Sequence, residues 1–211
     1  MAKSHTLLYY LLQYRKLYPD EPILLLYRPT KDSNWSDRAL LFDKKYSPFK
    51  QYNHRSMLKN EIVIEFDHED QEVNKEATRK VSERLRADGI AHSFWHSGNK
   101  SFHIHCLLEL PEDLRDRKTL KKAFLDHYTK ELGIKPDYQL CIDNHLIRAE
   151  GGLHEKSGRH KTLVRTSGEY PRACPVNDGV WVEYRRRVQA SMVRHAQRTS
   201  SSLRDSAPIK F

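Results

Sequence analysis

One stretch of the chain constrains the fold most, because strand-like and helix-like patterns alternate in it in a fixed order. It opens with EIVIEFD (61–67), in which apolar residues recur at every second position, as in a half-buried strand. Residues 71–88 then place apolar side chains four apart on one helical face, at Val73, Ala77, Val81 and Leu85. Two strands, 92–96 and 101–109, and a second helix, 112–132, follow. This order predicts an α+β domain with a mainly antiparallel sheet.

The remaining patterns frame this stretch. They predict helices over 4–18 and 179–198 and strands over 22–28, 39–42 and 161–166, with a loop over 134–160. We expect a single domain over 1–198, made of an N-terminal α/β unit (1–60) and a core (61–198). The tail, 199–211, is rich in serine and basic residues and is expected to be disordered.

The charge balance favours polyanionic partners. The chain has 211 residues and a formal net charge of +9, and each phosphate that a basic residue neutralises releases counterions. Apolar residues make up 38% of the chain, enough for a real core. The three cysteines, Cys106, Cys141 and Cys174, are widely separated, so we expect neither a disulfide framework nor a structural zinc.

No apolar run approaches the roughly 18 residues of a membrane span. The first residues, MAKSHTLLYYLLQYRK, contain an apolar stretch that a glutamine and two tyrosines interrupt, and no small-residue cleavage site follows. They are more typical of an amphipathic helix than of a signal peptide. We therefore expect an intracellular protein with no membrane partner.

Three clusters of side chains carry chemistry, and the first is Glu65-Phe66-Asp67. Residues two apart in a strand point to the same face, so both carboxylates are expected to project side by side. Two carboxylates held that close repel each other unless a cation lies between them. A divalent cation with oxygen ligands is the simplest solution, and a solvent-exposed strand edge is the alternative.

The second cluster is SGNKSFHIH (97–105). Its turn offers backbone N–H groups and the Ser97 hydroxyl to a phosphate, and Lys100 adds positive charge. His103 and His105 follow on one strand face, where an imidazole can bind a phosphate oxygen or a metal. An ordinary hairpin followed by two structural histidines is the alternative.

The third cluster lies between Asp137 and Arg159. It concentrates acidic, basic and hydroxyl side chains around a Gly-Gly turn, at Asp137, Asp143, His145, Arg148, His154, Lys156, Ser157 and Arg159. Cations beside flexible glycines suit a triphosphate or a nucleic-acid backbone. An aspartate from this stretch could complete a metal site begun by Glu65 and Asp67. A solvated surface loop is the alternative.

Taken in order, the three clusters resemble the signature motifs of the archaeo-eukaryotic primase superfamily. EIVIEFDHED is similar to the acidic first motif, with Glu65 where that family has Asp. SGNKSFHIHC is similar to the second motif, with Ser101 where the family often has Gly, and NHLIRAEGGLHEKSGR resembles the segment after the third acidic residue. The resemblance covers roughly residues 61–165.

The resemblance implies a template-dependent nucleotidyltransferase, a primase or primase-polymerase, that uses two Mg²⁺ or Mn²⁺ ions. Glu65, Asp67 and Asp137 would be the catalytic metal ligands, with Asp143 as the alternative to Asp137. The incoming nucleoside triphosphate would bind Ser97, Asn99, Lys100, His103, Arg148, His154 and Lys156.

The same resemblance implies an RNA-recognition-like antiparallel sheet with flanking helices, joined to a small additional α/β unit. The implied partners are a single-stranded DNA template and nucleoside triphosphates. The chain has no zinc knuckle and no room for a helicase domain, so a large primase subunit or a helicase is a further candidate partner.

Two other interpretations remain open from the sequence. His103-Ile104-His105 is also the histidine pair of HUH-type nickases, in which both histidines bind one metal and a tyrosine attacks DNA. Tyr128, Tyr138 and Tyr184 would be the candidate nucleophiles. The second alternative is a primase-like subunit that binds nucleic acid without catalysis.

Overall fold

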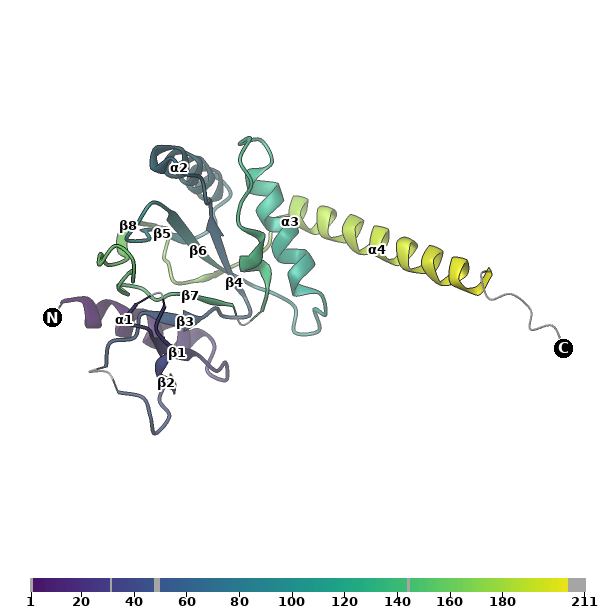
Figure 1. Cartoon of the computed structure of the whole chain (residues 1–211). Coiled ribbons are helices and arrows are strands. Elements are labelled where there is room, and N and C mark those ends of the chain that lie inside the picture. Colours follow the sequence, from purple (N-terminus) through teal and green to yellow (C-terminus); the bar gives the residue numbers. More distant parts are fainter. Residues whose placement is uncertain (1, 31, 48–49, 144, 205–211) are drawn as a thin grey trace.

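Nine strands and four helices form the described part of the chain, which covers residues 2–30, 32–47, 50–143 and 145–204 of the computed structural model (Figure 1). The helices are α1 (Ala2–Leu17), α2 (Gln71–Ala87), α3 (Arg117–Thr129) and α4 (Asp178–Arg204), with a 3-10 turn η1 (Tyr138–Cys141). The strands are β1 (Leu24–Tyr27), β2 (Ser36–Leu40), β3 (His54–Ser56), β4 (Glu61–Glu65), β5 (His92–His96), β6 (Phe102–Leu108), β7 (Leu146–Arg148), β8 (Thr162–Ser167) and β9 (Ala173–Cys174).

The strands form two sheets. The first has the order β2-β1-β3-β7, and the second has the order β4-β6-β5-β8 with β9 added beside β6. Apart from β6–β9, the pairings described are antiparallel, which confirms the predicted α+β class. Because β7 pairs with β3, one strand of the first sheet comes from the second half of the chain, and the sheets do not divide at residue 60.

Alternation along β4 gives the second sheet two different faces. Ile62 and Ile64 belong to the large apolar core, together with buried residues of α2 and α3 such as Val81 and Phe124. Val63 points the other way and packs with Met57, Leu140 and Ile147 in a small cluster that links β4 to β7. The polar residues Glu61 and Glu65 share that second face, so β4 presents carboxylates toward the first sheet.

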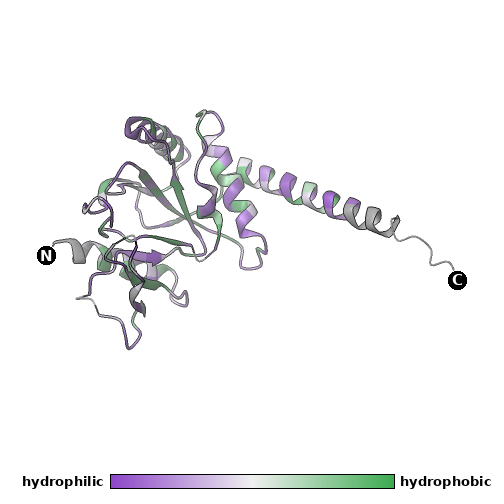
Figure 2. Ribbon diagram, in the orientation of Figure 1, coloured by the Kyte–Doolittle hydropathy of each residue, from purple (hydrophilic) through white to green (hydrophobic). Residues whose placement is uncertain are grey.

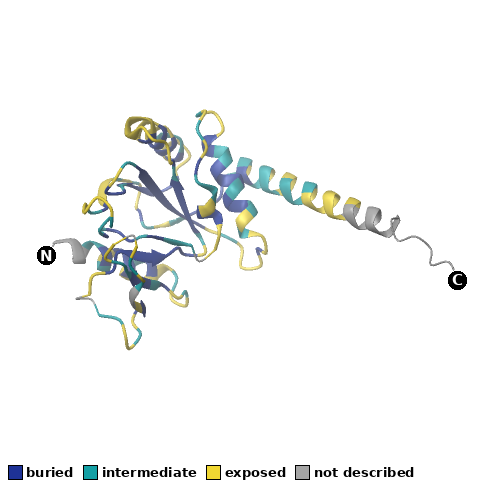
Figure 3. Cartoon of the chain, in the orientation of Figure 1, coloured by how far each residue is buried: buried dark blue, intermediate teal, exposed yellow. Residues whose placement is uncertain are grey.

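Helices α2 and α3, which pack against the second sheet, are amphipathic as the sequence predicts. On α2 the positions four apart are buried except Val73, which is 38% exposed at the first turn. Asp70 caps α2 by accepting a hydrogen bond from the Glu72 N–H, and Asp116 caps α3 through the Thr119 N–H. Figures 2 and 3 show the result, with apolar, buried helix faces turned inward and polar, exposed faces turned outward.

Local predictions failed at several places. β4 ends at Glu65 rather than at Asp67, because the Glu65 carbonyl accepts a hydrogen bond from the Asp137 N–H (2.9 Å) and the chain then turns toward α2. The polar tripeptide β3 was missed, and β7 lies inside the segment 134–160 that was predicted to be a loop. Both are three-residue strands, which are too short to show periodicity in the sequence.

Helix α4 leaves the body of the protein and extends away from it (Figure 1). Its first turns pack against α3, whereas the described side chains from Ser191 to His195 are exposed (Figure 3). The helix runs to Arg204, so residues 199–204 are helical where disorder was predicted, and 205–211 lie outside the described residues. No helix in the described part of the chain combines the length and the apolar character needed to cross a bilayer.

Candidate active site

A cavity of about 200 Å³ brings the three sequence clusters together where the two sheets meet. Six predicted site residues are among those that line it: Glu65, Ser97, His103, Asp137, Arg148 and His154. Its lining also includes His54 from the first sheet, Ser101, and His145. Segments separated by up to about a hundred positions in the sequence thus meet around one polar hollow.

Glu65 and His103 face each other across the β4–β6 ladder. They are register partners, and His103 Nε2 lies 3.2 Å from Glu65 Oε2. Burial alone would raise the pKa of Glu65, but the charge and hydrogen bond of His103, helped by the Ser101 hydroxyl, lower it to about 2. Glu65 is therefore an ionised carboxylate in the wall of the cavity.

The other ring nitrogen of His103 is unusual. His103 is 5% exposed, and its Nδ1 has no hydrogen-bond partner among the described residues. Burial lowers the pKa of this imidazole, and Glu65 opposes the effect. A buried polar atom without a partner is costly, so its position in the cavity wall favours a ligand that supplies the missing contact.

Asp137 lies next to Glu65 at the end of β4. Its N–H donates to the Glu65 carbonyl (2.9 Å), and its Oδ1 accepts from the Gln139 N–H (2.9 Å) as the cap of η1. The alternative, Asp143, is exposed, pairs with Lys121 (3.2 Å) and is absent from the cavity lining. Of the two aspartates, Asp137 is the one that the fold brings to Glu65.

The structure does not bring Asp67 into the cavity lining. Its side chain is 74% exposed and pairs with Lys100 Nζ at 2.9 Å, because the chain has left the sheet after Glu65. Asn99, Lys100 and Lys156 are likewise outside the lining. The Asp67–Lys100 contact nevertheless places the first and second clusters side by side.

Arg148 is held by a carboxylate that the sequence did not indicate. Its Nη1 donates to Glu155 Oε2 (2.8 Å) and to the Leu153 carbonyl (2.7 Å). Glu155, whose side chain is 4% exposed, also lies 3.5 Å from Arg28 Nε and 3.3 Å from His54 Nε2. Burial raises the pKa of Glu155, but the hydrogen bond and charge of Arg148, a backbone hydrogen bond and the nearby His54 together lower it. Glu155 therefore holds three basic side chains of the first sheet and its flanking residues.

The turn at 97–100 is locked to the loop at 153–160. Ser157 Oγ donates to the Gly98 carbonyl (2.6 Å), and Gly98 has φ +92°. A Cβ added at Gly98 would lie 2.8 Å from the Arg159 carbonyl oxygen and 3.2 Å from His154 Cβ. Only glycine fits there, because the second and third clusters touch through its backbone.

Beneath the cavity lies a buried ionic network that the sequence also did not reveal. Arg55 binds Glu61 through both terminal nitrogens (2.8 and 2.7 Å) and reaches Glu150 at 2.6 Å. His105 Nδ1 lies 2.7 Å from Glu61 and its Nε2 lies 2.8 Å from Lys161 Nζ. All five side chains are essentially buried, and burial lowers the pKa of Lys161 to about 7.

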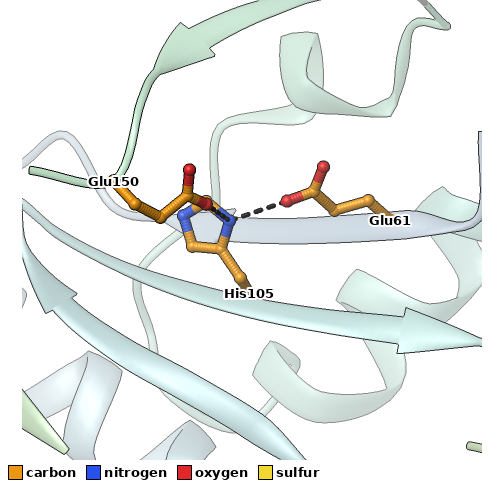
Figure 4. A group of neighbouring side chains, drawn as sticks. All are labelled: Glu61, His105 and Glu150. Atoms are coloured by element: carbon orange, nitrogen blue, oxygen red, sulfur yellow. Dashed lines mark hydrogen bonds and ion pairs between the residues drawn. The ribbon is translucent and has the colours of Figure 1, made fainter. Parts of the chain in front are cut away.

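This network contains the one trio of described residues whose ligand atoms lie within 4.8 Å of one another, namely Glu61, His105 and Glu150 (Figure 4). Both of its carboxylates already hydrogen-bond to the Arg55 guanidinium, and Glu61 also bonds to His105 Nδ1. The trio is therefore satisfied without a metal. Within the described residues, the predicted trio Glu65, Asp67 and Asp137 does not meet the same 4.8 Å criterion.

The donors in the cavity nevertheless fit one divalent cation in part. Glu65 and Asp137 offer carboxylate oxygens, the ligands that Mg²⁺ and Mn²⁺ favour, and His103 adds an unpartnered nitrogen. Asp67 would have to exchange Lys100 for the ion. The exposed Asp67–Lys100 ion pair contributes only about 0–1 kcal/mol, so breaking it would cost little when a cation binds.

The contacts count against a nickase centre. Both nitrogens of His105 face Glu61 and Lys161, and His105 does not line the cavity with His103. The hydroxyl of Tyr128 donates to Asp88 (2.8 Å) and that of Tyr138 binds Asp126, while Tyr184 packs against Trp181. None of the three tyrosines is among the lining residues.

No family model and no curated protein sequence matches the chain. Among solved structures, it is similar to the "Polymerase Domain from Mycobacterium tuberculosis Ligase D in complex with DNA", with a TM-score of 0.44 and 13% sequence identity. The likeness covers 79% of this chain and 71% of that one. At this level it carries no argument about the function of the chain.

Proposed function

We propose that this chain is a template-dependent nucleotidyltransferase, a primase or primase-polymerase that joins nucleoside triphosphates along a single-stranded DNA template. One observation carries the proposal. A single cavity gathers carboxylates from the first and third clusters and hydroxyl, imidazole and guanidinium groups, whose chemistry suits a phosphate, from the second and third.

Six of the lining residues have a role that their chemistry allows. Glu65 and Asp137 would hold a divalent cation, Mg²⁺ or Mn²⁺, with Asp67 and a second ion as the further expectation. When bound, such ions lower the pKa of a hydroxyl nucleophile and neutralise charge on the phosphates. Ser97, His103, Arg148 and His154 would bind and orient the triphosphate, with Asn99, Lys100 and Lys156 as candidates at the rim.

Glu155 gives Arg148 a defined orientation before any nucleotide binds. The guanidinium of Arg148 donates hydrogen bonds to Glu155 (2.8 Å) and to the Leu153 carbonyl (2.7 Å). Arg148 therefore has little side-chain entropy left to lose when a nucleotide binds. The basic surface of the protein would attract the template, and a large primase subunit or a helicase is the further partner that this function would need.

The test is extension of a primed DNA template with labelled nucleotides and Mn²⁺, comparing wild type with Asp137→Ala. Since a metal contributes several kcal/mol to the reaction, we expect a loss of about a hundredfold or more. Asp143→Ala is the matched control, because Asp143 lies six residues away, outside the cavity. Wild-type protein that binds DNA but incorporates no nucleotide would favour a non-catalytic subunit, and a covalent phosphotyrosine adduct would favour a nickase.

A further inference from the structure

Trp35 lies outside both apolar clusters of the described residues. The other two tryptophans contribute to the core, Trp95 at 1% exposure and Trp181 packed against its edge. Trp35 is only partly buried, at the end of the polar segment PTKDSNW that precedes β2. An indole is among the largest apolar side chains that a core can bury. Core packing therefore does not explain why Trp35 lies beside polar groups.

Two residues fix the position of this indole. The Arg28 guanidinium lies over the ring, 4.4 Å from its centroid, and the His54 ring meets it edge-on at 4.9 Å. Arg28 is itself held at both ends. Its backbone pairs with the Asn53 side chain at 2.9 and 2.6 Å, and its Nε lies 3.5 Å from Glu155. The guanidinium over the ring thus lies at ion-pair distance from the same carboxylate that binds Arg148.

This anchoring places the indole one side chain away from the cavity. His54 contacts Trp35 on one side and belongs to the cavity lining on the other. Arg148, which binds the same carboxylate as Arg28, also lines the cavity. Trp35 itself is not among the lining residues, so a ligand with its phosphates beside Arg148 would meet the indole only by extending past His54.

We propose that Trp35 stacks against the base of the incoming nucleoside triphosphate, a role that rests on the proposed function. Every nucleobase has a π face, so stacking on an indole tolerates all four bases. A template-dependent enzyme needs this kind of contact, because the template and not the pocket must select the base. The bound guanidinium of Arg28 keeps the ring positioned for it.

The experiment measures binding of two ligands, a nucleoside triphosphate and inorganic tripolyphosphate, each with Mn²⁺, by calorimetry. Trp35→Ala is expected to weaken binding of the nucleoside triphosphate about tenfold or more and to leave tripolyphosphate binding unchanged. Trp35→Phe keeps a π face and should retain most of the affinity. Trp181→Phe is the matched control, because Trp181 packs on the core away from the cavity lining.

The outcomes separate this proposal from the one on which it rests. If Trp35→Ala weakens neither ligand, or both equally, stacking is overturned while the phosphate cavity stands. A third titration uses a single-stranded DNA oligonucleotide. If Trp35→Ala weakens binding of this oligonucleotide alone, the ring belongs to the DNA strand and the role for the incoming nucleotide is overturned. If wild-type protein binds neither ligand, the proposed function fails and the stacking role fails with it.

Intrinsic fluorescence gives a second readout that a structural role would not move. Stacking should quench one of the three tryptophans when the nucleoside triphosphate binds. The quench should persist in Trp181→Phe and disappear in Trp35→Phe. A quench that survives in Trp35→Phe would overturn the proposal.

Discussion

The loss of Arg55 should destabilise this fold strongly. Its guanidinium is fully buried and is shared by Glu61 and Glu150, so Arg55→Ala leaves two buried carboxylates without their counter-charge. Breaking a buried pair by removing one partner costs about 3–5 kcal/mol. We expect a decrease of that size in the free energy of unfolding, measured with urea. Arg79→Ala is the control, since Arg79 pairs with Glu76 at the exposed surface and its loss should change the free energy of unfolding little.

The same residue shows where sequence patterns stop being informative. Arg55 and Glu150 lie 95 positions apart; Arg55 belongs to no motif, and Glu150 lies inside the third cluster without having been expected to bind anything. Their pairing depends on β3 lying between β1 and β7, an arrangement that no local pattern encodes. Glu65, Ser97, His103, Arg148 and His154, by contrast, belong to recognisable local motifs, so their place in one cavity was within reach of the sequence.

At the scale of elements, the close contact between the 97–100 turn and the 153–160 loop predicts the effect of a substitution at Gly98. Gly98→Ala forces a Cβ to within 2.8 Å of the Arg159 carbonyl oxygen, so the two segments must separate. We expect tripolyphosphate binding to weaken about tenfold or more, because Ser97 and His154 lie on either side of this contact. Gly89→Ala is the matched control. Gly89 also has positive φ, but nothing lies within 4 Å of its added Cβ, so it should cost stability without weakening binding.

Element boundaries explain the displaced site residue. The alternation in EIVIEFD correctly predicts which sheet face Ile62, Ile64 and Glu65 point to. The prediction of a continuing strand fails after Glu65, where β4 ends. The backbone bond from Asp137 to Glu65 ends the strand, and a contact across more than seventy residues cannot be seen locally. Asp67 accordingly pairs with Lys100 at the surface.

At the scale of the molecule, the buried network joins the two sheets and should make the fold sensitive to acid. Burial would raise the pKa of Glu150, but Arg55 and Lys161 hold it at about 2, against about 4.3 in an unfolded chain. The stabilisation is present above about pH 4.3 and is lost as the pH falls toward 2. We expect the free energy of unfolding to decline over this window. Glu150→Gln should be less stable at pH 7 and show a shallower decline, and an unchanged slope would contradict the assignment.

The long helix α4 has a consequence for the shape of the particle in solution. Its 27 residues correspond to about 40 Å of helix, most of it beyond the two sheets (Figure 1). A compact chain of this size would have a radius of gyration of about 17 Å. The protein will therefore diffuse and tumble as an elongated body, with a slender rod attached at one side.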